Sequence, residues 1–172
     1  MGSDETPVYG FRPVSSDDLP VLAAWLEEPH VARWWDDSDD KVSEIREAMI
    51  DPATEPFVAT LNGRPIGYIQ SYDPHAEDGH PYQDQPRGTF GIDQFIGEPD
   101  LVGLGHGPRL IAAFVDRLFQ RGALRVITDP DPTNDRAIRA YAKAGFRPLD
   151  TRTTVYGPAL IMACDPPTRK NE

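Results

Sequence analysis

The stretch over residues 103–146 constrains the fold more than any other part of this 172-residue chain. A loop over 103–107 with glycine at alternate positions comes first, and an amphipathic helix follows it. A short apolar strand over 125–129 then leads to a second helix, which begins at Asn134 and ends at Gly145. Helices that alternate with a strand in this order predict a βαβ crossover between parallel strands.

The first hundred residues predict antiparallel strands instead. Asn62-Gly63 is a two-residue hairpin signal, because both residues tolerate a positive φ. A helix capped by Ser16 or Asp17 is expected to stop at Pro29. Strands are expected over residues 9–13, 56–61, 64–72, 88–95, 146–154 and 155–163, a further helix over 43–50, and an irregular loop over 73–87. These elements predict a single-domain α/β fold over 1–165 with a mixed, mostly antiparallel sheet, and a flexible tail over 166–172.

Charge and composition narrow the classes of partner. The chain has 17 basic and 28 acidic residues, a net charge of −11. This charge argues against binding to nucleic acids or anionic membranes and suits a cationic small molecule. The single cysteine, Cys164, excludes an internal disulfide framework. Without an apolar stretch near the roughly 20 residues that span a bilayer or a signal peptide, we expect a cytoplasmic protein. No motif sets its oligomeric state, for which a monomer and a homodimer are both open.

The glycine loop has the composition of an anion site. Gly103, Gly105 and Gly107 stand directly before a helix, so their backbone N–H groups and the helix N-terminus can hold a pyrophosphate. A flexible turn into a helix is the alternative at this stage. The spacing fits neither a nucleotide-kinase loop nor the dinucleotide fingerprint.

A second motif follows one helix and one strand later. Its spaced residues are Asn134, Ala137, Ile138, Tyr141, Lys143, Gly145 and Phe146. With the glycine loop, this motif resembles the GNAT superfamily of acyl-CoA-dependent N-acetyltransferases. Within that superfamily the chain is similar to the aminoglycoside 6′-N-acetyltransferases, which confer antibiotic resistance. The segments that carry this similarity are Trp34-Trp35, 65–72, 91–94, 128–130 and 156–159.

The resemblance implies a GNAT fold, in which two parallel strands splay apart and helices flank the sheet. It implies acetyl-CoA as co-substrate, an aminoglycoside as acceptor and direct attack of the amine in a ternary complex. The cofactor-binding residues that it implies are Phe95, Ile96, Gly103, Leu104, Gly105, His106, Gly107, Asn134 and Tyr141. The substrate-binding residues are Trp35, Tyr72, Asp78, Asp93 and Asp129.

Two side chains are candidates for the chemistry. By the resemblance and by its position near a strand end, Asp93 takes the proton of the amine, directly or through one water. Tyr141 is the family's usual donor to the leaving thiolate. Without the resemblance, Asp93 could be a turn former, Tyr141 a core aromatic and Asp129 a turn residue.

The segment from Asp73 to Asp100 is acidic, with seven acidic residues against one basic residue. Carboxylates accept from ammonium groups and aromatic faces pack on sugar rings, so this segment with Trp35, Tyr72 and Tyr82 favours an amino sugar. A solvated acidic loop is the alternative. His75 and His80 match no common metal spacing, and no metal is expected.

Two other functions remain compatible with the sequence. Related GNAT branches acylate lysine-type amines of siderophores or protein N-termini. A GNAT domain that has lost its base can also bind acyl-CoA as a sensor without catalysing a reaction.

Overall fold

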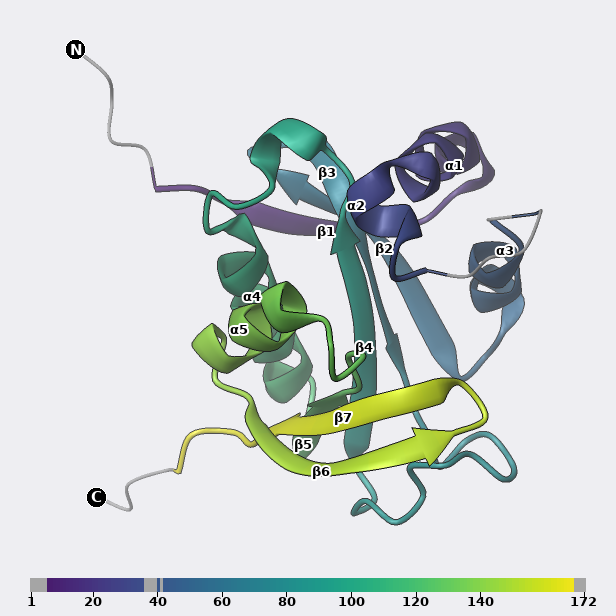
Figure 1. Ribbon diagram of the computed structural model, residues 1–172, viewed down its shortest axis with the longest axis vertical. Coiled ribbons are helices and arrows are strands. Elements are labelled where there is room, and N and C mark those ends of the chain that lie inside the picture. Colours follow the sequence, from purple (N-terminus) through teal and green to yellow (C-terminus); the bar gives the residue numbers. More distant parts are fainter. Residues whose placement is uncertain (1–5, 36–39, 41, 169–172) are drawn as a thin grey trace.

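The computed structural model describes residues 6–35, 40 and 42–168, which form one sheet with helices on both faces (Figure 1). In chain order the elements are β1 (Tyr9–Pro13), the 3₁₀ helix η1 (Ser16–Asp18), α1 (Leu19–Glu27), α2 (Pro29–Ala32), α3 (Ser43–Ile50), β2 (Thr54–Leu61), β3 (Arg64–Tyr72), β4 (Thr89–Ile96), the 3₁₀ helix η2 (Pro99–Leu101), α4 (His106–Gln120), β5 (Arg125–Thr128), α5 (Asp135–Lys143), β6 (Arg147–Thr154) and β7 (Gly157–Cys164).

The seven strands lie in the order β1-β2-β3-β4-β5-β7-β6. Neighbours are antiparallel except β4 and β5, which are parallel and are joined through α4, so the predicted crossover and the predicted fold class are confirmed. These two strands pair only from Thr89 with Arg125 to Gly91 with Ile127. Beyond Gly91, the described part of the chain gives β4 no further pairing with β5. The splayed seam that results is where the functional clefts meet.

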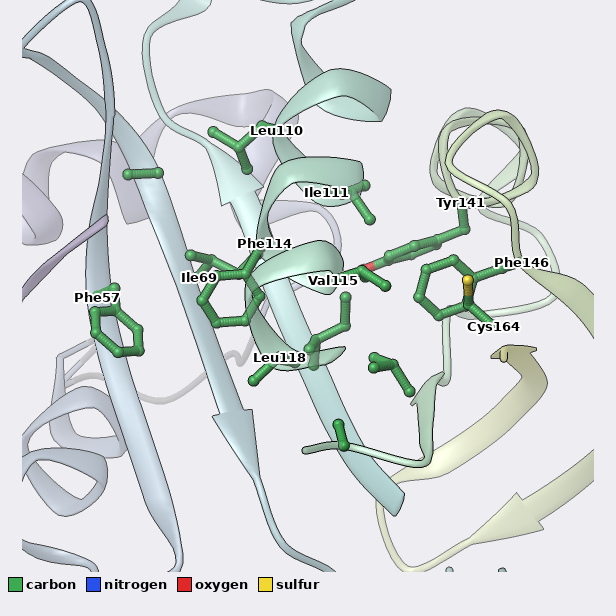
Figure 2. Packing of buried hydrophobic residues seen from close by; sticks show 14 of the residues in the cluster. Phe57, Ile69, Leu110, Ile111, Phe114, Val115, Leu118, Tyr141, Phe146 and Cys164 are labelled. Carbon is green, nitrogen blue, oxygen red and sulfur yellow. The ribbon is translucent and has the colours of Figure 1, made fainter. Parts of the chain in front are cut away.

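Each face of the sheet buries its own cluster. Helices α4 and α5 cover one face, where Leu110, Ile111 and Phe114 of α4 pack on the strands with no solvent exposure (Figure 2). Helices α1 and α2 and the start of α3 pack on the opposite face, against Tyr68 and Phe95. Adjacent residues of a strand point to opposite faces, which is why one strand serves both clusters.

The hairpin between β2 and β3 forms at the predicted residues. Asn62 and Gly63 have φ values of 50° and 85°, which a tight two-residue turn of this kind requires. From the turn, β2 and β3 pair in one register through Leu61 with Arg64 and Thr60 with Pro65, and the register shifts between Thr60 and Ala59. This hairpin places β3, and with it Gln70 and Tyr72, beside β4.

Two boundaries of the first helix differ from the prediction. Ser16 and Asp17 lie inside η1 and do not cap it; Ser15 precedes the helix, because Asp18 Oδ2 accepts the Ser15 N–H and closes this turn. α1 ends at Glu27, but Pro29 begins α2 rather than interrupting the chain, because proline fits the first turn of a helix where its missing N–H costs nothing. The acidic residues Asp36, Asp37 and Asp39, which follow Trp34-Trp35 in the sequence, lie outside the described residues, as do residues 169–172 of the tail expected over 166–172. Among the described residues, no helix combines the length and apolar character that crossing a membrane requires.

Candidate active site

Two clefts meet at the splayed seam between β4 and β5. The first, the acidic cleft, has a volume of about 830 Å³ and is walled by α3, β3, β4, the end of β5 and the β6–β7 turn. The second, the glycine-loop cleft, has about 780 Å³ and lies between α2, β4, the 103–107 loop and α5. Six residues line both clefts: Arg33, Trp34, Trp35, Gln94, Asn134 and Ala137. Ligands in the two clefts would therefore touch at the seam.

Asp93, the candidate base, lies on β4 and lines the acidic cleft. Gln70 Nε2 donates a 3.0 Å hydrogen bond to Asp93 Oδ2, and the Tyr68 hydroxyl donates to Gln70 Oε1 at 2.6 Å. Tyr68 thereby fixes the orientation of the Gln70 amide. Burial, and then the charge of Asp129, raise the pKa of Asp93 to about 7. The carboxylate can therefore bind and release a proton near neutral pH.

Asp129 directly follows β5 and also lines the acidic cleft. The hydroxyl of Tyr82 donates a 2.5 Å hydrogen bond to Asp129 Oδ2. Burial raises the pKa of Asp129, and the hydrogen bond from Tyr82 acts in the opposite direction. Asp129 is thus a cleft carboxylate as well as a residue at a strand end.

Tyr141 serves the core and the cleft at once. It is 4% exposed and packs edge-to-face on Phe146 with ring centroids 5.4 Å apart (Figure 2). It also lines the acidic cleft. Burial raises the pKa of Tyr141 to about 12, against the effect of hydrogen bonds with Thr128 and Gln94, so its phenol stays protonated near neutral pH.

The glycine loop forms one wall of the second cleft through Gly103, Gly105 and Gly107. The φ values of Gly103 and Gly105 are 79° and 86°, and a Cβ at either would meet nothing within 4 Å. Backbone conformation rather than space therefore requires glycine at these two positions. Gly105 also stands directly before α4, so backbone N–H groups at the helix N-terminus face the loop.

The other predicted cofactor residues divide into two groups. Phe95, Ile96 and Asn134 line the glycine-loop cleft, and Asn134 Oδ1 accepts the Ala137 N–H as the cap of α5. Leu104 is 63% exposed, and neither it nor His106 is among the lining side chains. These two residues can contribute to that cleft through their backbone.

The two clefts differ in the charge of the side chains that line them. Arg136, Arg139 and Lys143 of α5 line the glycine-loop cleft. The acidic cleft is lined by seven acidic residues and one arginine: Glu44, Glu47, Asp51, Glu77, Asp93, Asp129, Asp131 and Arg33. The sequence prediction missed the α5 cations and the three acids at and after α3. Both sets are spaced i, i+3, i+7, which places side chains on one face of a helix and could have revealed them.

The acidic segment from Asp73 to Asp100 is not one binding surface. Asp78 is exposed and lies outside the cleft lining, where its neighbour Glu77 is found instead. Asp93 also lines the cleft, whereas the remaining four acids contact arginines or backbone: Asp73 with the His75 N–H, Asp84 with Arg152, and Glu98 and Asp100 with Arg64. An arginine distant in sequence neutralises such residues, which composition alone does not reveal.

The predicted aromatic surfaces also divide. Trp35 and Tyr72 line the acidic cleft, and Trp35 packs edge-on against Phe95 at 5.0 Å between ring centroids. Tyr82 has no solvent exposure and presents its hydroxyl, not its ring face, toward Asp129. Among residues 6–35, 40 and 42–168, no three His, Cys, Asp or Glu side chains gather as metal ligands.

Comparisons with known proteins identify the family of this chain. A family model of the acetyltransferase (GNAT) domain matches residues 15–154. The chain is 36% identical over 160 residues to an aminoglycoside N(6')-acetyltransferase type 1 of Klebsiella pneumoniae, covering 88% of this chain and 80% of the relative. It is 27% identical over 168 residues to the lysine N-acyltransferase MbtK of Mycobacterium tuberculosis, covering 94% and 80%.

Solved structures give the same result. The crystal structure of AAC(6')-Ib with coenzyme A and kanamycin superposes with a TM-score of 0.83 at 36% identity, over 92% of this chain and 95% of that one. The fold is thus that of a family of acetyl-CoA-dependent acetyltransferases. The chain belongs to the GNAT acetyltransferases and, among them, to the aminoglycoside N(6')-acetyltransferase family.

Proposed function

We propose that this enzyme transfers the acetyl group of acetyl-CoA to the 6′-amino group of an aminoglycoside by direct attack in a ternary complex. The observation that carries the proposal is the seam, where a cleft lined by seven acidic residues meets the glycine-loop cleft. Carboxylates accept hydrogen bonds from the ammonium groups of an amino sugar. We further propose that the enzyme acts in the cytoplasm, as a monomer or homodimer, and confers aminoglycoside resistance.

The glycine-loop cleft fits acetyl-CoA, which supplies an activated thioester carbonyl when bound. Backbone N–H groups around Gly103 and Gly105 would hold its pyrophosphate, because no side chain covers them. The cationic side chains of α5 would bind its phosphates, and Asn134 would contact the pantetheine amide. No metal is part of the proposed site.

Asp93 is the general base in this proposal. An aminoglycoside amine is largely protonated at neutral pH, so a proton must leave before the nitrogen can attack. A base is most effective when its pKa lies near the working pH, and the pKa of Asp93 is raised to about 7. Gln70 keeps the Asp93 carboxylate in place while it accepts that proton, directly or through one water.

Tyr141 stabilises the leaving thiolate as a hydrogen-bond donor. Its pKa is raised to about 12. Since a free thiol titrates near about 8.5, the phenol is the weaker acid of the two. Tyr141 therefore keeps its proton and donates a hydrogen bond. The nitrogen releases its second proton to solvent as the C–N bond forms and the C–S bond breaks, and the thiolate takes its proton from solvent.

Gly105→Ala tests the loop. A side chain at a positive φ costs about 1–2 kcal/mol, so we expect the Kd for coenzyme A to rise about 5–30-fold while the KM for the aminoglycoside stays unchanged. Titration calorimetry measures the first effect and steady-state kinetics the second. Gly122→Ala is the matched control, because Gly122 has a φ of 101° and equal space but lies outside both clefts. Equal losses of affinity in both variants would contradict this use of the loop.

An acceptor panel tests the function itself. With acetyl-CoA, we expect kanamycin and tobramycin to release free thiol, and an aminoglycoside with a hydroxyl group at the 6′ position to release none. A lysine-type amine is the second acceptor, because of the similarity to a lysine N-acyltransferase over 94% of the chain. Turnover of the lysine-type amine alone would replace the proposed acceptor, and no thiol release from any aminoglycoside would reject it.

A further inference from the structure

Tyr82 has no part in the mechanism above, although its hydroxyl contacts a carboxylate of the acidic cleft. It lies in the loop over 73–88 between β3 and β4 and has no solvent exposure. Its hydroxyl donates to Asp129 Oδ2 at 2.5 Å. Burial raises the pKa of Tyr82 far above its usual value, so this hydroxyl remains a donor at every pH at which the enzyme works.

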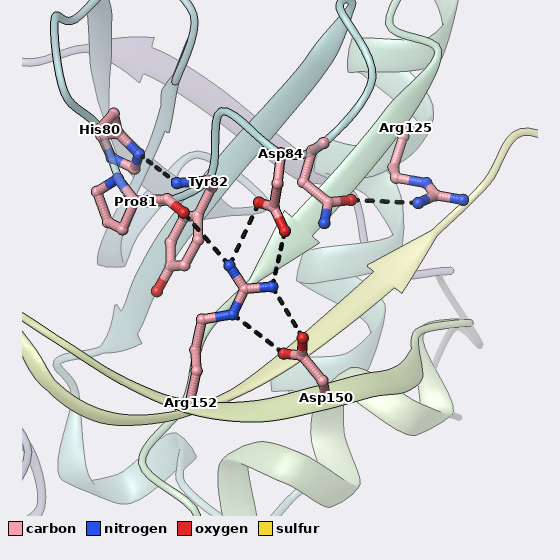
Figure 3. Close-up of polar contacts among 8 residues, drawn as sticks. His80, Pro81, Tyr82, Asp84, Arg125, Asp150 and Arg152 are labelled. Atoms are coloured by element: carbon pink, nitrogen blue, oxygen red, sulfur yellow. Dashed lines mark hydrogen bonds and ion pairs between the residues drawn. The ribbon is translucent and has the colours of Figure 1, made fainter.

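Arg152 of β6 contacts Tyr82 and the residues on both sides of it in the loop (Figure 3). Its guanidinium carbon lies 5.8 Å from the centroid of the Tyr82 ring, a cation–π distance. The same guanidinium donates to Asp84 and Asp150 at 2.9 Å each, and to the carbonyl of Pro81 at 3.3 Å. The residues on both sides of Tyr82 are thus tied to β6, which fixes where the hydroxyl points.

Several titratable groups surround Asp129 and interact with it. They are Tyr72 of β3, Asp93 of β4, Tyr82 of the 73–88 loop, Tyr141 of α5 and Tyr156 of the β6–β7 turn. Of these, Asp93 is the other acid. Negative charge on either carboxylate makes it harder to ionise the other, so near neutral pH the pair competes for one proton.

A hydrogen-bond donor to one of the two carboxylates determines which aspartate keeps the shared proton. A hydrogen bond to the charged form of Asp129 favours ionisation there, which leaves the proton on Asp93. We propose that Tyr82 is a positioning residue, which holds Asp129 ionised and directed at the substrate ammonium and thereby sets the pH at which Asp93 is free to accept a proton. This inference rests on the proposed function, and it gives Asp129 and Asp93 separate tasks.

Tyr82→Phe removes only the hydroxyl. Asp129 then ionises less readily, and Asp93 gains a share of the deprotonated state. We expect the acid limb of kcat to move about one pH unit lower, and the KM for kanamycin at pH 6 to rise about tenfold. A variant that lowers kcat by one factor at every pH, with KM unchanged, would mean that Tyr82 only fills space and would overturn the proposal.

A double-mutant cycle isolates the route through Asp129. In the Asp129→Asn background, Tyr82→Phe should change neither the pH profile nor the KM further, because the acceptor carboxylate is gone. An equal effect in both backgrounds overturns the proposal. Arg152→Gln should move the acid limb in the same direction as Tyr82→Phe. Arg125→Gln is the control for Arg152→Gln, because Arg125 binds Gln85 of the same loop and Asp165 but does not contact Tyr82. An equal shift of the acid limb in Arg125→Gln would contradict an effect that passes through Tyr82.

A titration separates this inference from the proposed function. Carbon-13 NMR of labelled aspartate carboxyls in the unliganded enzyme needs no acceptor and no turnover. Tyr82→Phe should raise the titration midpoint of Asp129 and lower that of Asp93. If wild-type enzyme turns over kanamycin but neither midpoint moves, the inference fails and the function stands. If no aminoglycoside is acetylated and the midpoints still move, the function fails and the role of Tyr82 in proton placement stands.

Discussion

Asp93→Asn should lower kcat about 10²–10⁴-fold, the range that a general base contributes. The amide is nearly isosteric with the carboxylate but cannot accept a proton, so the reacting amine would depend on solvent to lose its own. Asp93 faces the acidic cleft and is absent from the lining of the glycine-loop cleft, so the Kd for coenzyme A should not change. Thiol release measures the first quantity, and calorimetric titration measures the second.

The dependence of the rate on pH gives a second expected effect of this substitution. Because the pKa of Asp93 is raised to about 7, wild-type activity should fall tenfold per pH unit below about pH 7. Asp93→Asn should abolish that acid limb. Asp116→Asn on the exposed side of α4 is the control and should leave the rate and the profile intact. An Asp93→Asn enzyme with wild-type kcat would assign the base to another carboxylate, and Asp129 would be the next to replace.

Phe114→Ala should destabilise the protein by about 3–5 kcal/mol. Phe114 has no solvent exposure and makes an edge-to-face contact with Phe11 at 4.9 Å between ring centroids. It makes a second such contact with Phe57 at 5.7 Å (Figure 2). Truncation leaves a cavity between α4 and the sheet, where rigid strands cannot collapse around it. Urea unfolding measures the loss as a lower midpoint with an unchanged m-value.

A surface substitution provides the comparison for the core. Ile50 ends α3 and is 85% exposed, so Ile50→Ala should change the free energy of unfolding by no more than about 0.5 kcal/mol. Losses of similar size in the two variants would show that α4 does not anchor the sheet as described.

Local signals in the sequence account for the parts of the fold that were predicted correctly. Asn62-Gly63 determines a hairpin by its own backbone preferences, and the periodicity of α4 gives its buried face without reference to any other element. The difference at Pro29 was also local, because proline can end one helix and begin another.

The candidate site was less predictable because its side chains come from distant segments. Asp93 and Tyr141 were identified through their motifs, and the structure brings both to one cleft. Asp84 belongs to the acidic segment that favoured an amino sugar as a whole, yet Arg152 pairs with it from 68 residues away. Conversely, Glu44 and Glu47 of α3 reach the cleft only because α3 folds beside β2. Charge content was foreseeable from composition, but its placement depended on tertiary structure.

The seam between β4 and β5 has a consequence for solubility. Unpaired strand edges normally recruit strands of other molecules and promote aggregation. Here the bare stretch of β4 lies in the interior of the sheet, flanked by β3 on one side and by β5 and β7 on the other. A strand of another molecule could pair with this stretch only by entering the sheet between β4 and β5, not by adding to an outer edge. The gap in pairing that opens the seam is therefore kept away from the two edges, β1 and β6, at which sheets normally recruit further strands.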